Sequence, residues 1–273
     1  MWFIGGMSFY TWRLKLGLPV VTFWLLLANI GVYLLQILTH AFQLPWGPFF
    51  GLSMPGILQG RIWQFVTYQF LHGGPFHLLL NMLMLYFLGS EVERSIGRRH
   101  FSVLYLISGL LGGLGWLMID AYDDICIGAS AAIFGLLSAF AVLYPRREVT
   151  VLVMLVFPVT LKAWVLAVLL GAVQMLFVMS PGVGGIAYSA HLAGAVAGFF
   201  YTAAVFRPEL LRDLGGYFSA RWRRSRQARA DRRVQDETLE VDRLLEKIAR
   251  EGIHALTPSE RKRLEAASRS RSR

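Results

Sequence analysis

Two kinds of side chain are scarce in this sequence: cysteine throughout, and charged residues over positions 1–206. Cys126 is the single cysteine, which excludes an intrachain disulfide and a cysteine-based zinc site. Positions 1–206 hold only 9 of the 27 Lys and Arg residues and 6 of the 17 Asp and Glu residues. With 55% hydrophobic residues and a mean hydropathy of +0.50, this scarcity argues against a soluble globular protein and is typical of a multi-pass membrane protein.

Positions 19–206 contain six stretches that are long and apolar enough to cross a bilayer. A spanning helix needs about 20 mostly apolar residues, and we expect helices at 19–38, about 76–90, 101–119, 125–144, 163–180 and 186–206. The intervening stretch 149–161 is short and contains Pro158, so we interpret it as interfacial or as a lead-in to the fifth helix. The run Pro-Gly-Val-Gly-Gly at 181–185 separates the last two helices. The predicted fold class is therefore an all-α membrane protein with six transmembrane helices.

Basic residues cluster at alternate ends of these helices and set their expected orientation. One set of loops carries Arg13, Lys15, Arg94, Arg98, Arg99, Arg146, Arg147 and Lys162. The opposite loops carry Arg61, then Asp120, Asp123 and Asp124, and then no charge. Because loops rich in Lys and Arg stay in the cytoplasm, we expect both termini there. The second, fourth and sixth helices then run from the outer side inward.

Each inward-running helix carries a polar side chain near its outer end. The second has His77 and Asn81, which share one helix face, the fourth has Ser130, and the sixth has His191. Polar groups at membrane depth normally face the bundle interior or a wet cavity. Four such residues at a similar depth predict a single water-accessible site.

The chemistry of this set is that of acyl transfer. A serine such as Ser130 becomes a nucleophile when a histidine within hydrogen-bond reach takes its proton. Backbone N–H groups at a helix start and Asn or His side chains stabilise the developing oxyanion. Gly128 lets the chain turn before the serine, and Gly194 with Gly198 permits the sixth helix to approach closely. Taken alone, each residue has a structural explanation, such as helix packing for Ser130; their common depth favours catalysis.

These residues lie in three motifs, QFLHGGPFHLLLNMLMLYFLGSEVERSIG at 69–97, GASAAIFG at 128–135 and AHLAGAVAG at 190–198. In this order the motifs resemble the rhomboid family of intramembrane serine proteases, in its bacterial form. The resemblance implies a Ser130–His191 dyad without a third acidic residue, and an oxyanion site formed by the Ser130 N–H, His77 and Asn81. It also implies that Phe134 packs under the histidine, and that the chain lies in a bacterial inner (plasma) membrane.

The sequence departs from the family pattern at two places. Ala131 stands where the family has glycine after the serine, and its methyl group is expected to line the substrate pocket and crowd the side chain at the cleavage site. The first-loop Trp-Arg pair of many members is Trp63-Gln64 here, which removes the arginine as a loop anchor. Glu93 and Arg94 resemble a structural family feature.

The resemblance and the charge pattern divide the chain into four parts: a cytoplasmic segment 1–18, a membrane domain 19–206, a basic juxtamembrane linker 207–235 and a helical tail 236–273. Lys and Arg in the linker favour anionic lipid, and we expect no nucleic-acid partner. Gly252 suits a helix end, and Thr257 with Glu260 forms a capping-box pattern. The tail is therefore predicted to be two short helices packed as a hairpin, with its partner left open.

The leading hypothesis is a serine endopeptidase that cleaves transmembrane segments of other membrane proteins. The alternative is a catalytically silent rhomboid-like protein that binds membrane helices; the presence of both Ser130 and His191 argues against it. A transporter is disfavoured because no polar path continues to the inner side. A metalloprotease is disfavoured because no His-Glu-x-x-His motif is present, and we expect neither a metal nor a cofactor.

Overall fold

The computed structural model describes residues 3–4, 7–8, 17–40, 43–120, 125–153, 156–180 and 187–271. The basic residues Arg13 and Lys15, the acidic residues Asp123 and Asp124, and the run at 181–185 lie outside the described residues. The chain divides into two compact units, Met1–Pro208 and Glu209–Arg273.

The first unit is built almost entirely of helices, which confirms the predicted all-α membrane fold class. Its longer helices are α2 (Val20–Thr39), α6 (Pro75–Met84), α7 (Ser90–Ile119), α8 (Ser130–Leu143), α9 (Ala163–Val178) and α10 (Tyr188–Phe206). Between α2 and α6 lie α3 (Trp46–Phe50), α4 (Met54–Leu58), α5 (Gln64–Thr67) and η2 (Tyr68–Phe70). Two antiparallel strand pairs join β1 (Phe3–Ile4) to β2 (Met7–Ser8) and β3 (Glu148–Val153) to β4 (Phe157–Lys162).

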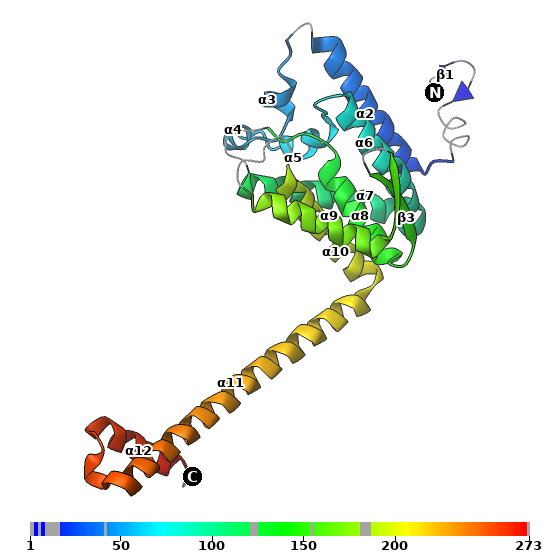
Figure 1. Cartoon of the computed structure of the whole chain (residues 1–273). Helices are drawn as coiled ribbons and strands as arrows, with labels where there is room; N and C mark the ends of the chain where they lie inside the picture. Colours follow the sequence, from blue (N-terminus) through cyan, green and yellow to red (C-terminus); the bar gives the residue numbers. More distant parts are fainter. Residues whose placement is uncertain are drawn as a thin grey trace. The chain divides into compact units, whose positions relative to one another are not determined.

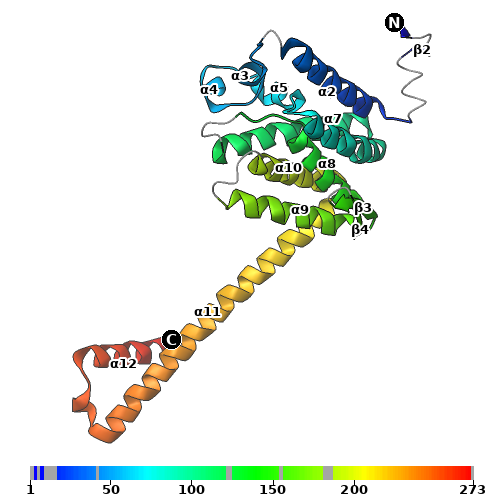
Figure 2. The ribbon, with the colours of Figure 1, turned by 45° about the horizontal axis from the view of Figure 1, so that its top comes forward.

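Helix α8 lies at the centre of the first unit. It packs against α7 and α10 and also contacts α6 and α9, an arrangement that can be followed in Figures 1 and 2. With 14 residues it is about 21 Å long at 1.5 Å per residue. This is shorter than the hydrocarbon core of a bilayer, which is about 30 Å thick. A helix of this length that reaches one membrane face therefore begins, at Ser130, within the membrane depth.

The predicted second and third helices form one helical run that is interrupted at a single residue. α6 continues through a π-helical turn, η3 (Leu85–Gly89), into α7. Gly97 has φ 77° and ψ 163°, which lies outside the helical region and divides the run into two helices. Glycine adopts this positive φ because it has no Cβ. The charged stretch 91–100, predicted as a loop, is therefore helical on both sides of Gly97.

Residues 148–162 include a β-hairpin that ends directly before α9, and the sequence analysis did not predict these two strands. β3 and β4 pair antiparallel, with Glu148 opposite Lys162 and Val153 opposite Phe157. Polar residues alternate with valine and leucine in the half of each strand farther from the turn, at 148–151 and 159–162, which is the period-two pattern of a strand. Pro158 is compatible with this pairing because both strands of an isolated hairpin are edge strands.

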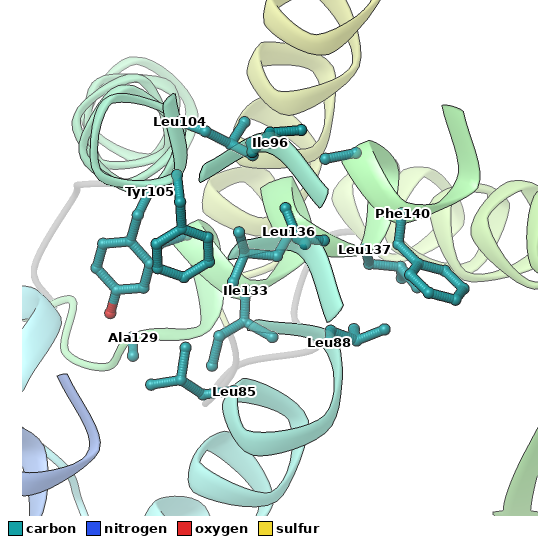
Figure 3. Close-up of a cluster of buried hydrophobic side chains, with 14 of the residues drawn as sticks. Leu85, Leu88, Ile96, Leu104, Tyr105, Ala129, Ile133, Leu136, Leu137 and Phe140 are labelled. Carbon is teal, nitrogen blue, oxygen red and sulfur yellow. The ribbon is translucent and has the colours of Figure 1, made fainter. Parts of the chain in front are cut away.

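The interior of the first unit contains one large apolar cluster around α8. Leu85 and Leu88 from η3, Ile96 and Leu104 from α7, and Ile133, Leu136, Leu137 and Phe140 from α8 converge there (Figure 3). Large apolar side chains also cover the outside, including Trp24, Leu34 and Leu38 on α2. An apolar exterior of this extent is expected for a surface that contacts lipid rather than water.

Glu93 connects α7 to the start of α2. Its carboxylate accepts hydrogen bonds from the N–H groups of Val21 and Thr22, at 2.9 and 2.7 Å, and from the Thr22 hydroxyl. A carboxylate at a helix N-terminus satisfies N–H groups that have no acceptor within the helix. Arg94 donates to the carbonyl of Gly17 at 2.7 Å. These contacts support the structural role expected for the pair.

By length and composition, three helical stretches of the described residues can cross a membrane: Val20–Thr39, Pro75–Ile119 and Tyr188–Phe206. The second comprises 45 residues and contains the break at Gly97, so it supplies two of the predicted helices. α8 and α9 are apolar but shorter.

The second unit consists of two helices joined by a short turn. α11 (Pro208–Glu251) is a single helix of 44 residues, followed by η4 (Ile253–Ala255) and α12 (Pro258–Arg271). Gly252, at φ 83°, ends α11 as predicted, and Glu260 accepts from the Thr257 N–H at 2.8 Å in the predicted capping box. The first tail helix is not short, however, because it is continuous with the residues predicted as a basic linker.

Candidate active site

Ser130 is the first residue of α8, and backbone hydrogen bonds fix the segment that precedes it. Cys126 and Leu52 exchange two backbone hydrogen bonds, at 2.8 and 3.0 Å. Two residues farther on, the Gly128 N–H donates to the carbonyl of Tyr68 at 2.9 Å. The Tyr68 hydroxyl in turn donates to the Gly109 carbonyl on α7 at 2.7 Å. The segment 126–129, which precedes Ser130, is thus hydrogen-bonded to the stretch between α2 and α6.

His191 lies one turn into α10 and faces the start of α8. Its Nε2 atom is 2.7 Å from Ser130 Oγ, and its side chain is 8% exposed. This contact requires α8 and α10 to lie very close together. A Cβ atom on Gly194 would overlap the Ala131 carbonyl, and one on Gly198 would overlap the Gly135 carbonyl. The two glycines therefore permit the approach that brings serine and histidine together.

Phe134 stacks on the imidazole of His191. The ring centroids are 4.5 Å apart and the planes differ by 10°. Because Phe134 is four residues after Ser130 on α8, it lies on the same helix face as the serine. The stack limits the tilt of the imidazole and is the contact that the family resemblance implies for this position.

The other nitrogen of His191 contacts a residue that the sequence analysis missed. Nδ1 is 3.0 Å from Oε1 of Gln174, a buried side chain on α9. A polar side chain inside an apolar span is a recognised signal of function. Gln174 carries the only side-chain amide in Ala163–Val178. That signal was available in the sequence, but the partner of Gln174 depends on the rotation of α9 about its axis.

His77 and Asn81 lie on α6 beside the start of α8. A Cβ atom on Gly128 would lie 2.9 Å from Cε1 and Nε2 of His77 and 3.7 Å from Ser130 Oγ. Nδ1 of His77 accepts from the Gly73 N–H at 3.4 Å, so in the neutral ring the proton lies on Nε2, on the ring edge beside Gly128. The Asn81 amide donates one hydrogen to the His77 carbonyl at 3.0 Å and retains a second hydrogen on the same nitrogen.

His72 is a neighbour of the site and not a member of it. Its ring lies 5.0 Å from that of His77, centroid to centroid, and its side chain is buried. Burial, followed by the proximity of His77, lowers the pKa of His72 to about 4, so it is neutral at pH 7. Among the described residues no group of three or more His, Cys, Asp or Glu side chains is placed to hold a metal ion.

The Ala131 side chain lies in a helix contact and does not face an open pocket. It is 1% exposed, and a Cβ atom on Gly112 of α7 would lie 2.6 Å from its methyl group. It belongs to a small apolar cluster with Leu52, Tyr68, Trp116, Leu117, Cys126 and Ala190. Consecutive side chains on a helix point about 100° apart, so Ala131 turns toward α7 while Ser130 faces His191. A role in the substrate pocket was predicted for Ala131, whereas the structure places its side chain in the contact with α7.

Gln64 anchors the loop in place of the arginine found in many family members. It is fully buried, its amide donates to the Pro48 carbonyl at 3.0 Å, and its oxygen accepts from the Ser53 N–H at 3.2 Å. A neutral amide supplies both a donor and an acceptor without burying a charge. The departure at this position therefore changes the anchor and leaves the loop attached.

Comparison with known families and proteins matches most of the first unit. A family described as the Rhomboid domain matches residues 59–208, and a family of unknown function, DUF6576, matches residues 229–270. The rhomboid relative YdcA of Bacillus subtilis (strain 168) is 32% identical over 183 residues, which cover 66% of this chain and 85% of the relative. RHOMBOID-like protein 4 of Arabidopsis thaliana is 35% identical over 157 residues, covering 55% of this chain and 36% of the relative. Rhomboid protease GluP of Bacillus subtilis is 32% identical over 155 residues, covering 56% and 28%.

Proposed function

The chain belongs to the rhomboid family, and we propose that it is an active intramembrane serine endopeptidase whose catalytic dyad is Ser130 and His191. Relatives that are named as proteases support this activity at the level of the family. The observation that carries the proposal for this chain is the 2.7 Å contact between Ser130 Oγ and His191 Nε2. Its substrates are transmembrane segments of other membrane proteins in the same bilayer.

In the proposed reaction, Ser130 Oγ attacks the carbonyl carbon of the scissile peptide bond while His191 Nε2 takes the hydroxyl proton. The tetrahedral intermediate collapses, the carbon–nitrogen bond breaks, and His191 returns the proton to the leaving amine. A water molecule then attacks the acyl-enzyme ester, with His191 again acting as base. Ser130 is regenerated, and the substrate has been cut into two fragments.

The developing oxyanion has three candidate donors. The Ser130 N–H is in the first turn of α8, where N–H groups have no acceptor within the helix. Nε2–H of His77 and the second amide hydrogen of Asn81 are the other two, since Nδ1 of His77 and the first amide hydrogen of Asn81 already have partners. Donors held in place before reaction stabilise the transition state without reorganisation.

The membrane setting defines the substrate. In this proposal α8 reaches one membrane face and therefore begins within the membrane depth. The substrate segment then reaches Ser130 from the lipid, and a helical peptide bond must unwind to expose its carbonyl. Glycine and proline lower helix stability by about 1 and 3 kcal/mol relative to alanine. We therefore propose substrates with helix-breaking residues near the outer end of the span. The six-span topology with cytoplasmic termini, in a bacterial inner membrane, belongs to the same proposal.

The test is covalent labelling of the purified protein in detergent with a fluorophosphonate probe. Wild type should be labelled at Ser130, and Ser130→Ala and His191→Ala should lose the label while remaining folded. Ser180→Ala is the matched control, because Ser180 is a half-buried serine beyond the end of α9 whose hydroxyl donates to the Leu176 carbonyl at 2.8 Å. A catalytically silent rhomboid-like protein would give no label in wild type. Labelling that persists in Ser130→Ala would also contradict the assignment.

A further inference from the structure

α9 is apolar on its outer face and carries one buried amide group. Gln174 is 7% exposed, whereas its neighbours Met175 and Leu176 are exposed. Burying an amide without a partner is costly, so the position of Gln174 requires a hydrogen bond. Its oxygen has one at Nδ1 of His191, 3.0 Å away.

The direction of this contact selects one protonation state of the imidazole. An amide oxygen only accepts, so Nδ1 of His191 must carry the hydrogen. In the neutral ring Nε2 then has a free lone pair, and this is the atom 2.7 Å from Ser130 Oγ. The opposite tautomer would place a hydrogen on Nε2 and leave no base for the serine proton.

A second contact holds α9 against α10 at the same level. Phe177 and Tyr188 stack with their centroids 4.6 Å apart and their planes 17° apart. Phe177 follows Gln174 by three residues, and Tyr188 precedes His191 by three residues, so the two pairs lie about one helical turn from each other. The aromatic pair thus keeps the Gln174 side chain in register with the imidazole.

We propose that Gln174 is a positioning residue that holds His191 in the Nδ1–H tautomer, so that Nε2 is available to Ser130. It completes a Ser-His-Gln arrangement in which a neutral amide takes the place of an orienting carboxylate. An amide suits this buried position because an ionised carboxylate would carry a large desolvation cost. The proposal rests on the proposed function, since it concerns the base of that reaction.

The experiment uses the full-length protein in detergent and has two readouts. Nitrogen NMR of ¹⁵N-histidine-labelled protein reports which imidazole nitrogen of His191 carries hydrogen, with His191→Ala identifying its signals among the 6 histidines. The rate of fluorophosphonate labelling at Ser130 reports reactivity. Gln174→Met keeps the side-chain length and removes the acceptor, Gln174→Glu keeps an acceptor, and Leu176→Ala controls for changes on the outer face of α9.

Wild-type His191 should be protonated at Nδ1 and bare at Nε2. In Gln174→Met the His191 signals should shift toward the other tautomer. Labelling should slow by at least about tenfold, which corresponds to one neutral hydrogen bond. The upper bound is about 10⁴-fold, the loss that the wrong tautomer causes in a soluble triad. Gln174→Glu should recover part of the rate, and Leu176→Ala should match wild type.

A bare Nδ1 in wild type would overturn the proposal without any variant. An unchanged labelling rate in folded Gln174→Met would also overturn it, and so would a slower rate with unchanged His191 signals, because the effect would then be structural. If wild type is not labelled at all, the proposed function fails, and the tautomer signals alone decide whether Gln174 positions His191.

Discussion

Helices meet in different ways in the two units of the chain. In the first unit, α8 and α10 approach until glycine is the only residue that fits, at Gly194 and Gly198. In the second unit, Gly215 and Gly216 have no atom within 4 Å of an added Cβ atom. α11 and α12 are joined there by ion pairs such as Lys247–Glu260 at 3.0 Å.

The difference follows from the solvent of each unit. In lipid there is no hydrophobic driving force between apolar side chains, so membrane helices associate through close packing and interhelical hydrogen bonds. Charged side chains of the tail, in contrast, are hydrated, and exposed ion pairs add little stability. The site of the first unit uses the close packing directly, because the distance between Ser130 and His191 is set by the approach of α8 to α10. The same kind of substitution should therefore have very different effects in the two units.

The largest of these effects after loss of the dyad is expected at the oxyanion donors. His77→Ala and Asn81→Ala should each lower kcat by about 10²–10³, as removal of one oxyanion donor does in soluble proteases. The measurement is the rate of cleavage of a single-span substrate in proteoliposomes. His254→Ala, in the tail, is the control and should leave the rate unchanged. Wild-type rates in both α6 variants would show that this helix does not face the reacting carbonyl.

Glycine-to-alanine substitutions should lower the stability of the folded protein at the α8–α10 contact and not on α11. Gly194→Ala should destabilise the folded state by about 1–3 kcal/mol, as overpacking does, because its methyl group meets the Ala131 carbonyl. Gly171→Ala on α9 and Gly216→Ala on α11 have open space at the added methyl group and are the controls. Thermal unfolding in one detergent compares the three variants. Equal stabilities would mean that close approach of α8 and α10 is not required.

The sequence was sufficient for the fold class, and it singled out three residues whose side chains the structure brings together. Ser130, Phe134 and His191 lie in short motifs, and the structure brings these three side chains into contact. Their catalytic roles, and those of His77 and Asn81, stay predictions. The motifs work because helix spacing places residues three or four apart on one face.

What the sequence did not yield depends on the rotation and neighbours of each element. Gln174 was missed because its partner is 17 residues away on another helix. A pocket role was predicted for Ala131 because its place after Ser130 is visible in the sequence. The direction of its side chain, toward α7, is set by helix packing and is not visible there. The hairpin at 148–162 was missed because a short apolar stretch between two spans was weighed by length and not by its alternating pattern. The first tail helix was predicted too short because the exposed polar part of α11 has no apolar periodicity to mark where the helix begins.

The smallest effect is expected in the tail. The pKa of Glu260 is lowered from 4.5 to about 2, first by the hydrogen bond from the Thr257 N–H and then by Lys247. A carboxyl whose pKa is depressed on folding contributes stability that is present above the unfolded value and lost as the pH falls through the folded value. The start of α12 should therefore remain helical down to about pH 3 and lose order near pH 2.

Circular dichroism at pH 7 should show a modest loss of helix in Glu260→Ala and none in Glu251→Ala, an exposed neighbour. Both variants should label with the fluorophosphonate probe at the wild-type rate. A slower rate in Glu260→Ala alone would contradict the expectation that the fold of the tail does not affect the reactivity of Ser130.

The proposed function requires that Ser130, activated by His191, hydrolyses a peptide bond within a membrane span. The most direct measurement reconstitutes the protein with a single-span substrate whose outer end contains glycine and proline, and identifies both fragments by mass spectrometry. We expect one cut near the outer end of the span, abolished equally by Ser130→Ala, His191→Ala and the double variant, because residues that act as a unit are not additive. This expectation would be contradicted by cleavage that persists in Ser130→Ala, or by intact substrate in the presence of wild type that is folded and labelled.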